Sequence, residues 1–202
     1  MDIINKIISD ISDKDFTPPQ HICDNTNDCL CEREISYKMK KKVFQQNKAQ
    51  LEKIFEGMKA LNYNTEKRKE IEWYADEIQH KYRQTNDNLH CIYKKIKRAD
   101  KIKYQNKEYS FIKKTSTEQK IDYSEFKEKL SPSEFWVYSI NYYNDDFRFR
   151  IKFEDNNPIS LDVELEIDGE PSAKEVKDQF IDNLNKFGKL IQNIIDSKDQ
   201  IE

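Results

Sequence analysis

Cysteine and histidine residues gather at two places in the sequence and are the first candidates for chemistry. Three of the four cysteines and one histidine fall within residues 21–31, and the fourth cysteine follows a histidine near residue 90. Zinc in structural sites is held by four thiolate or imidazole ligands in a tetrahedron. We therefore predict a structural zinc site with ligands drawn from His21, Cys23, Cys29, Cys31, His90 and Cys91.

Two alternatives to the zinc site stay open. The spacing Cys-x5-Cys-x-Cys differs from the Cys-x2-Cys pairs typical of zinc sites, so the cysteines could be unligated thiols. A thiol or a zinc-bound water could instead serve a small enzyme, although no glycine turn for an oxyanion site lies nearby. Because the first residues lack the long apolar segment of a secretory signal, we expect reduced cysteines and a cytoplasmic protein, with the nucleus as an alternative.

Basic residues form the second group with chemical potential. They occur just after residue 40 and again between residues 94 and 101, with tyrosines interleaved, which is typical of surfaces that bind phosphate and stack on bases. The net charge of −3 argues against nucleic acid as the main partner, so nucleic-acid binding is an alternative to a protein partner. The residues of this alternative are Lys41, Lys42, Lys94, Lys95, Lys97, Arg98 and Lys101.

Acidic residues alternate with apolar ones in the C-terminal half. Asp162, Glu164 and Glu166 share one face of a predicted strand, and a basic face of the preceding strand, residues 148–152, lies opposite. Cross-strand ion pairing on a solvated face explains this arrangement without catalysis. The chain has only three glycines, so neither a phosphate-binding loop nor a dinucleotide-binding fingerprint can be assembled from it.

The elements that would position the cysteines and lysines are two predicted helices. Apolar residues recur every seven positions over 34–61, and in steps of four and three over 71–99, which is the seam of a coiled coil. A short connection between them favours an antiparallel hairpin. The hairpin would bring Cys91 opposite Ile35, one turn from Cys31, and would gather the lysines at its base. A parallel homodimer through the second helix is the alternative.

The C-terminal half predicts a small sheet and a helix. Residues 135–143, 147–153 and 159–167 show the period of two expected for strands with one face buried and the other in water. Ser172 to Glu175 reads as a capping box that begins a helix whose apolar stripe would cover the sheet.

Taken together, the sequence predicts an α+β chain in which a long antiparallel coiled-coil hairpin precedes a β-meander covered by a C-terminal helix. Its expected parts are an N-terminal helix and Cys-rich arm (1–31), the hairpin (32–100) and a small α+β domain (101–202). The expected function is that of a non-enzymatic scaffold or adaptor with a protein partner or a second copy, and no stretch is apolar enough to imply a membrane.

Overall fold

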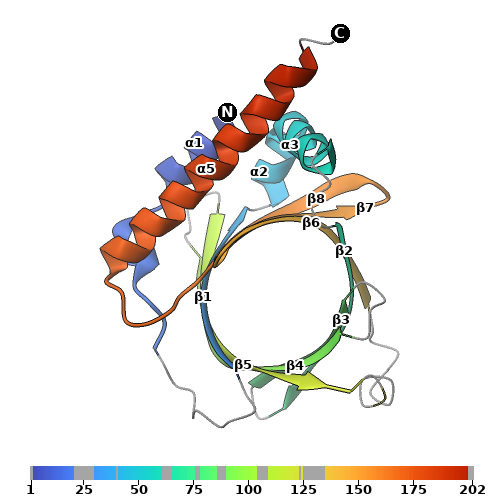
Figure 1. The fold of residues 1–202 in the computed structure, drawn as a ribbon. Coiled ribbons are helices and arrows are strands. Elements are labelled where there is room, and N and C mark those ends of the chain that lie inside the picture. The colour runs from blue at the N-terminus through green and yellow to red at the C-terminus, as the bar shows by residue number, and fades with distance from the viewer. Residues whose placement is uncertain are drawn as a thin grey trace.

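The computed structural model describes most of the chain. The described residues are 2–20, 30–39, 41–60, 65–75, 78–85, 90–103, 109–122, 124 and 135–199. Their dominant element is a closed barrel of eight antiparallel strands, which Figure 1 shows as a ring seen along its axis.

The strands follow one another around the barrel in an order that brings the two halves of the chain together. The strands are β1 (Leu30–Met39), β2 (Thr65–Ala75), β3 (Ile78–Thr85), β4 (His90–Lys103), β5 (Tyr109–Ile121), β6 (Phe135–Asn144), β7 (Phe147–Glu154) and β8 (Asn157–Glu166). Their order in space is β1-β5-β4-β3-β2-β6-β7-β8, and pairing of β1 with β8 closes the ring. The predicted domain boundary near residue 100 falls inside β4.

The described helices lie outside the barrel, on one side of it (Figure 1). They are α1 (Asp2–Asp10), the 3-10 turn η1 (Asp13–Phe16), α2 (Lys41–Gln46), α3 (Lys48–Ala60) and α5 (Ala173–Asp199). Contacts of α2, α3 and α5 reach β6, β7 and β8. None of these helices is long and apolar enough to cross a membrane.

The hydrophobic core lies between the helices and the outer face of the barrel. Alternate residues of β7 and β8, such as Phe149 and Val163, are fully buried there because successive side chains of a strand point to opposite faces. The long helix α5 supplies the other half of the core: Phe187 stacks on Phe149 with ring centroids 4.0 Å apart, and Phe180 contacts Phe147 at 6.0 Å. The charged residues between these apolar ones therefore point into the barrel.

The helix α5 begins as expected. The Glu175 carboxylate accepts hydrogen bonds from the backbone N–H and the hydroxyl of Ser172, while the Glu175 N–H donates to the Ser172 hydroxyl at 3.3 Å. This capping box satisfies backbone donors that the first turn of a helix leaves without partners.

The predicted helical hairpin is wrong, and with it the α+β architecture. Residues 34–39 belong to β1, and only 41–60 are helical, with Leu51, Ile54 and Met58 buried as the heptad spacing indicated. Residues 71–99 form parts of β2, β3 and β4 wherever they are described, and no coiled-coil seam exists among them. These strands lie away from the helices (Figure 1), so neither of their faces had to be apolar and the strand period of two was weak.

We expect Phe180→Ala to lower the free energy of unfolding by roughly 3–5 kcal/mol, because Phe180 is fully buried among Phe16, Phe111 and Phe147. Chemical denaturation measures this directly. The matched control is Asp178→Ala, an exposed position on the same helix, for which we expect a change within about 0.5 kcal/mol. Equal midpoints for the two variants would contradict the packing of α5 on the barrel.

Candidate functional site

The candidate site is built on the inner faces of β1 and β8. In the antiparallel register Glu34 lies opposite Glu166, and Ser36 lies opposite Glu164. Their neighbours along the strands, such as Ile35 and Leu165, are buried in the outer core. Because cross-strand partners point to the same face, the carboxylates of both strands converge inside the barrel.

Lys94 of β4 lies among three of the interior carboxylates. Its side chain is 2% exposed, and its Nζ lies 2.5 Å from the Glu118 carboxylate of β5 and 3.8 Å from that of Glu34. Lys94 also donates a hydrogen bond to Glu32. Among the described residues, Lys94 thus contacts three carboxylates at once, and this acid-rich cluster also includes Glu166 of the facing strand β8.

Two acids of this cluster have raised pKa values. Burial, together with the nearby Glu118 carboxylate, raises the pKa of Glu32 despite the attraction of Lys94. Burial also raises the pKa of Glu166, and the charges of Glu32 and Glu34 raise it further. Carboxylates that repel one another in this way are better satisfied when a cation binds between them.

Further into the barrel along the same wall, the carboxylates of β8 are paired with the cations of β7. Arg150 of β7 donates from Nη2 to Asp162 at 2.9 Å and to Glu164 at 2.7 Å, and Arg148 also pairs with Glu164. Burial would raise the pKa of Asp162, but the charges of Lys38, Arg150 and Lys152 outweigh it and lower that pKa to about 2.

The pKa of Glu34 is also lowered. Burial opposes the shift, but the charge of Lys114, which forms an ion pair with Glu34 from β5, and the charges of Lys94 and Arg148 outweigh it. Glu34 is therefore a permanently ionised carboxylate between the acid-rich and the balanced parts of the interior.

The cations form a row as well as pairs. Arg148, Arg150 and Lys152 alternate along β7, so their Cα atoms span about 13 Å of the inner wall. Asn141 of β6 lies opposite Arg150 and is fully buried. The Asn141 Oδ1 and the Arg148 Nε have no hydrogen-bond partner in the part of the chain that the structure describes. The Arg148 Nε is a donor that suits an anionic oxygen, whereas the Asn141 Oδ1 is an acceptor that suits a hydroxyl or another donor.

The predicted zinc site is not supported. His21, Cys23 and Cys29 lie outside the described residues, and of the His90 side chain nothing is described. Cys31 is disulfide-bonded, so the expectation of reduced cysteines is wrong for this residue. Cys91 is a buried free thiol in β4 whose pKa is raised by burial. Among the described residues, no three His, Cys, Asp or Glu side chains are placed to hold a metal ion as they stand.

The structure places the basic residues of the nucleic-acid alternative on α2 and β4. Lys94 points into the barrel, Lys95 is half-buried in the same strand, and Lys42 is exposed on α2. Of the others, Lys41 begins α2, and Lys97, Arg98 and Lys101 belong to β4.

The cross-strand ion pairs of β7 and β8 are present as expected, but on a different surface. They line a closed barrel and not a solvated face, because strands β1 to β5 complete the ring around them. The sequence interpretation missed Glu32, Glu34, Lys114 and Glu118. The repeated acid-x-acid pattern at 32–34 and 162–166 was the signal available for them.

The prediction of a non-enzymatic scaffold is wrong in its basis, and so is the expectation that the chain is not an enzyme. The seam that suggested a scaffold is absent from the described residues, whose strands instead enclose a cluster of buried acids and bases. Buried, interacting titratable groups concentrate at catalytic sites, because burying them costs several kcal/mol per ion.

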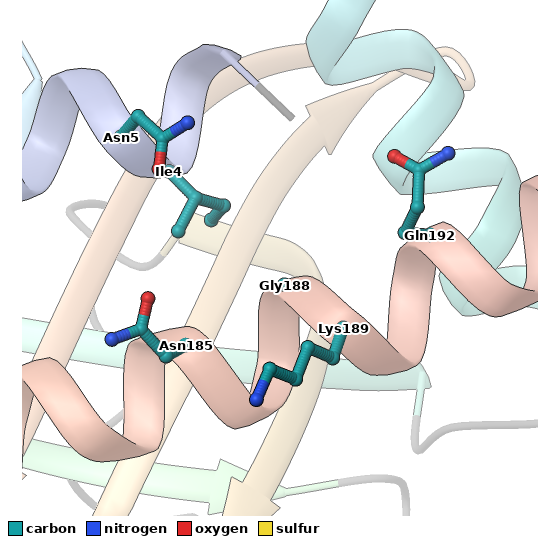
Figure 2. Close-up of a pocket in the computed structure, with 6 residues that line it drawn as sticks. All are labelled: Ile4, Asn5, Asn185, Gly188, Lys189 and Gln192. Atoms are coloured by element: carbon teal, nitrogen blue, oxygen red, sulfur yellow. The ribbon is translucent and has the colours of Figure 1, made fainter.

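A hollow outside the barrel lies between α1 and α5. It has a volume of about 220 Å³ and is lined by Ile4, Asn5, Asn185, Gly188, Lys189 and Gln192 (Figure 2). Gly188 allows the two helices to approach closely, since a Cβ at this position would lie 3.4 Å from the Ile4 side chain. Its lining carries one cation and no carboxylate, in contrast to the barrel interior.

The fold and its interior define the chain as a closed antiparallel barrel with an acid–base wall. No protein-family model matches it, and no curated protein matches its sequence. Among solved structures, it is similar to the PH1012 protein of Pyrococcus horikoshii OT3, with 13% identity, a TM-score of 0.45 and coverage of 78% of this chain and 90% of that one.

The chain is also similar to two solved triphosphatase structures. The Mimivirus capping enzyme triphosphatase is 14% identical, with a TM-score of 0.43 over 95% of this chain and 98% of that chain. The Pct1 RNA triphosphatase of S. pombe is 10% identical, with a TM-score of 0.42 over 81% and 84%.

We expect Glu164→Gln and Glu166→Gln to change stability in opposite directions. Removing the Glu164 charge leaves Arg148 and Arg150 short of a buried partner and should cost about 3 kcal/mol. Removing the Glu166 charge relieves repulsion from Glu32 and Glu34 and should raise the melting temperature at pH 8.

The gain from Glu166→Gln should disappear near pH 4. A carboxyl whose pKa is raised by folding destabilises the native state only as the pH rises above the usual value of 4.5. Melting curves from pH 4 to 8 measure the difference. A gain that stays constant over this range, or a loss at pH 8, would contradict the raised pKa of Glu166 in the folded chain.

Proposed function

We propose that the chain is a divalent-cation-dependent hydrolase of linear phosphate anhydrides, such as triphosphates. The observation that carries this proposal is the pairing, on one inner wall, of an acid-rich cluster with a row of cations. Carboxylates bind hard metal ions, and arginine and lysine bind phosphate oxygens. The divalent cation and the phosphate chain of such a reaction would therefore bind side by side on this wall.

The acid-rich cluster fits a divalent cation by the chemistry of its donors. Glu32, Glu34 and Glu166 offer only carboxylate oxygens, which magnesium and manganese prefer, whereas zinc favours nitrogen and sulfur. Burial and the nearby Glu32 and Glu34 carboxylates raise the pKa of Glu166, and a bound cation would offset both effects. Bound there, the ion would neutralise phosphate oxygens and polarise the phosphorus toward attack.

The row of cations supports an extended substrate. Arg148, Arg150 and Lys152 succeed one another along β7, and their charges are held in place by Asp162 and Glu164. Guanidinium groups bind phosphate oxygens through paired hydrogen bonds. A chain of linked phosphates presents anionic oxygens along its length, as this row requires, whereas a single phosphate would use only part of it.

Hydrolysis then needs mainly positioning and charge stabilisation. Water attacks a terminal phosphorus and a new P–O bond forms, while the bridging P–O bond breaks with its electrons going to the leaving phosphate. The proton that the water loses passes to solvent or to the leaving phosphate, so the step balances. Lys94 and the arginines stabilise the negative charge that develops on the oxygens of both groups. Glu166 is exposed to solvent at the end of β8, so water reaches the acid-rich cluster from this end of the barrel.

Release of inorganic phosphate from tripolyphosphate tests the proposal. We expect release in the presence of Mg²⁺ or Mn²⁺, none after chelation, and a loss of about 100-fold in kcat/KM for Glu34→Gln and for Lys94→Met. Glu56→Gln, an exposed glutamate on α3, is the matched control and should retain full activity. Circular dichroism verifies that each variant is folded.

The proposal fails if the folded wild-type chain releases no phosphate from tripolyphosphate or nucleoside triphosphates with any divalent cation. It also fails if release continues at the wild-type rate in Glu34→Gln and Lys94→Met.

A further inference from the structure

We propose that Asn141 positions the water that attacks the terminal phosphate in the proposed hydrolysis. This inference rests on the proposed function and adds a residue that holds the nucleophile. It starts from an amide oxygen that is buried inside the barrel and has no hydrogen-bond partner within the described ranges of the chain.

Asn141 lies on the inner wall of the barrel. The next residue, Tyr142, packs against Phe187 of α5 in the outer core, with ring centroids 5.0 Å apart, and successive residues of a strand point to opposite faces. In the register of β6 and β7, Asn141 lies opposite Arg150. Cross-strand partners have Cβ atoms about 5 Å apart, so Asn141 borders the centre of the row of cations.

Only one end of the Asn141 amide forms a hydrogen bond to a described residue. Its Nδ2 donates to the Ser139 hydroxyl at 3.3 Å, which holds the amide in place, whereas its Oδ1 is buried and unpaired. A buried acceptor without a donor destabilises the folded chain. A donor that arrives with the substrate would remove this cost.

The chemistry of the row leaves water as that donor. The guanidinium charges favour the anionic form of a bound phosphate, whose oxygens then accept hydrogen bonds and donate none. Tripolyphosphate brings no other hydroxyl group. A water molecule can donate one hydrogen to Asn141 Oδ1 and direct a lone pair at the phosphorus. Amide side chains orient attacking waters in this way in phosphoryl-transfer enzymes.

The depth of Arg150 brings a terminal phosphate beside this water. Its side chain is 5% exposed, compared with 20% for Arg148 and 28% for Lys152. A phosphate chain that enters past Arg148 therefore carries its leading, terminal group to Arg150, next to Asn141. Asn141 takes up no proton. The water keeps the hydrogen that faces Oδ1 and loses the other to solvent or to the leaving phosphate.

Hydrolysis of tripolyphosphate with Mg²⁺, together with melting curves of the ligand-free chain, tests the inference. Asn141→Leu keeps the branched shape of the side chain and removes the acceptor. We expect kcat to fall about 100-fold while KM stays within about threefold of the wild-type value, because the substrate still binds and only the water is misplaced. The melting temperature should rise, because the unpaired buried acceptor is gone.

Asn183→Leu is the matched control. Asn183 is also a buried asparagine, but it lies on α5 outside the barrel, accepts a hydrogen bond from Asn144 and donates one to the Gln179 carbonyl at 3.0 Å. This variant should lower the melting temperature and leave kcat unchanged. Asn141→Ala repeats the kinetic test with a smaller side chain if Asn141→Leu does not fold.

Each outcome has a defined meaning. Wild-type kcat in a folded Asn141 variant overturns the inference, and so does a loss of kcat/KM that lies mainly in KM, which would assign Asn141 to substrate binding. A lower melting temperature for Asn141→Leu overturns the premise that Oδ1 lacks a donor. If the wild-type chain hydrolyses no tripolyphosphate, the proposed function fails and the inference with it, whereas failure of the inference alone leaves wild-type turnover intact.

Discussion

The structure depends on one constraint, which is that charges pointing into a closed barrel must find partners inside it. An unpaired buried ion costs several kcal/mol, and no strand edge is open to relieve it. Lys94 forms ion pairs with three carboxylates inside the barrel, and Arg150 forms ion pairs with two. The apolar residues of the same strands must then lie outside, which explains why the helices pack on the outer wall.

This constraint couples the two proposed ligands. A divalent cation that takes the carboxylates of Glu32 and Glu34 would remove two of the three carboxylates that Lys94 contacts, together with the Glu34 partner of Lys114. A polyphosphate that takes the cations would leave the carboxylates unpaired. When both bind, each set of charges exchanges one partner for another, so each ligand strengthens the binding of the other, and by the same factor.

The sequence predicted some elements of this fold well and others not at all. The sequence predicted β7, β8 and α5 because α5 packs on one face of the sheet, which gives the strands an alternating pattern and the helix an apolar stripe. The capping box at Ser172 marked the start of this helix. The segments 71–75 and 78–85 lack that cover, so polar residues are tolerated on both faces and isolated apolar spacings imitated a coiled coil.

The candidate site shows the same limit of sequence reasoning. The ion pairs between Arg150 and its acidic neighbours follow from register and were predicted, but their enclosure was not. Enclosure depends on the pairing of β1 with both β5 and β8, contacts between residues that are up to 132 positions apart, such as Glu34 and Glu166. A charged strand face reads the same in sequence whether it meets water or the inside of a barrel.

The coupling between cation and polyphosphate is measured by calorimetric titration of Mn²⁺ with and without tripolyphosphate, at pH 7 and in the cold so that turnover is slow. We expect the protein to bind Mn²⁺ at least tenfold more tightly when tripolyphosphate is present, after correction for the Mn²⁺ that tripolyphosphate itself binds. Glu34→Gln should remove this gain. Equal Mn²⁺ affinities in the two titrations, or a gain that survives in Glu34→Gln, would contradict the coupling.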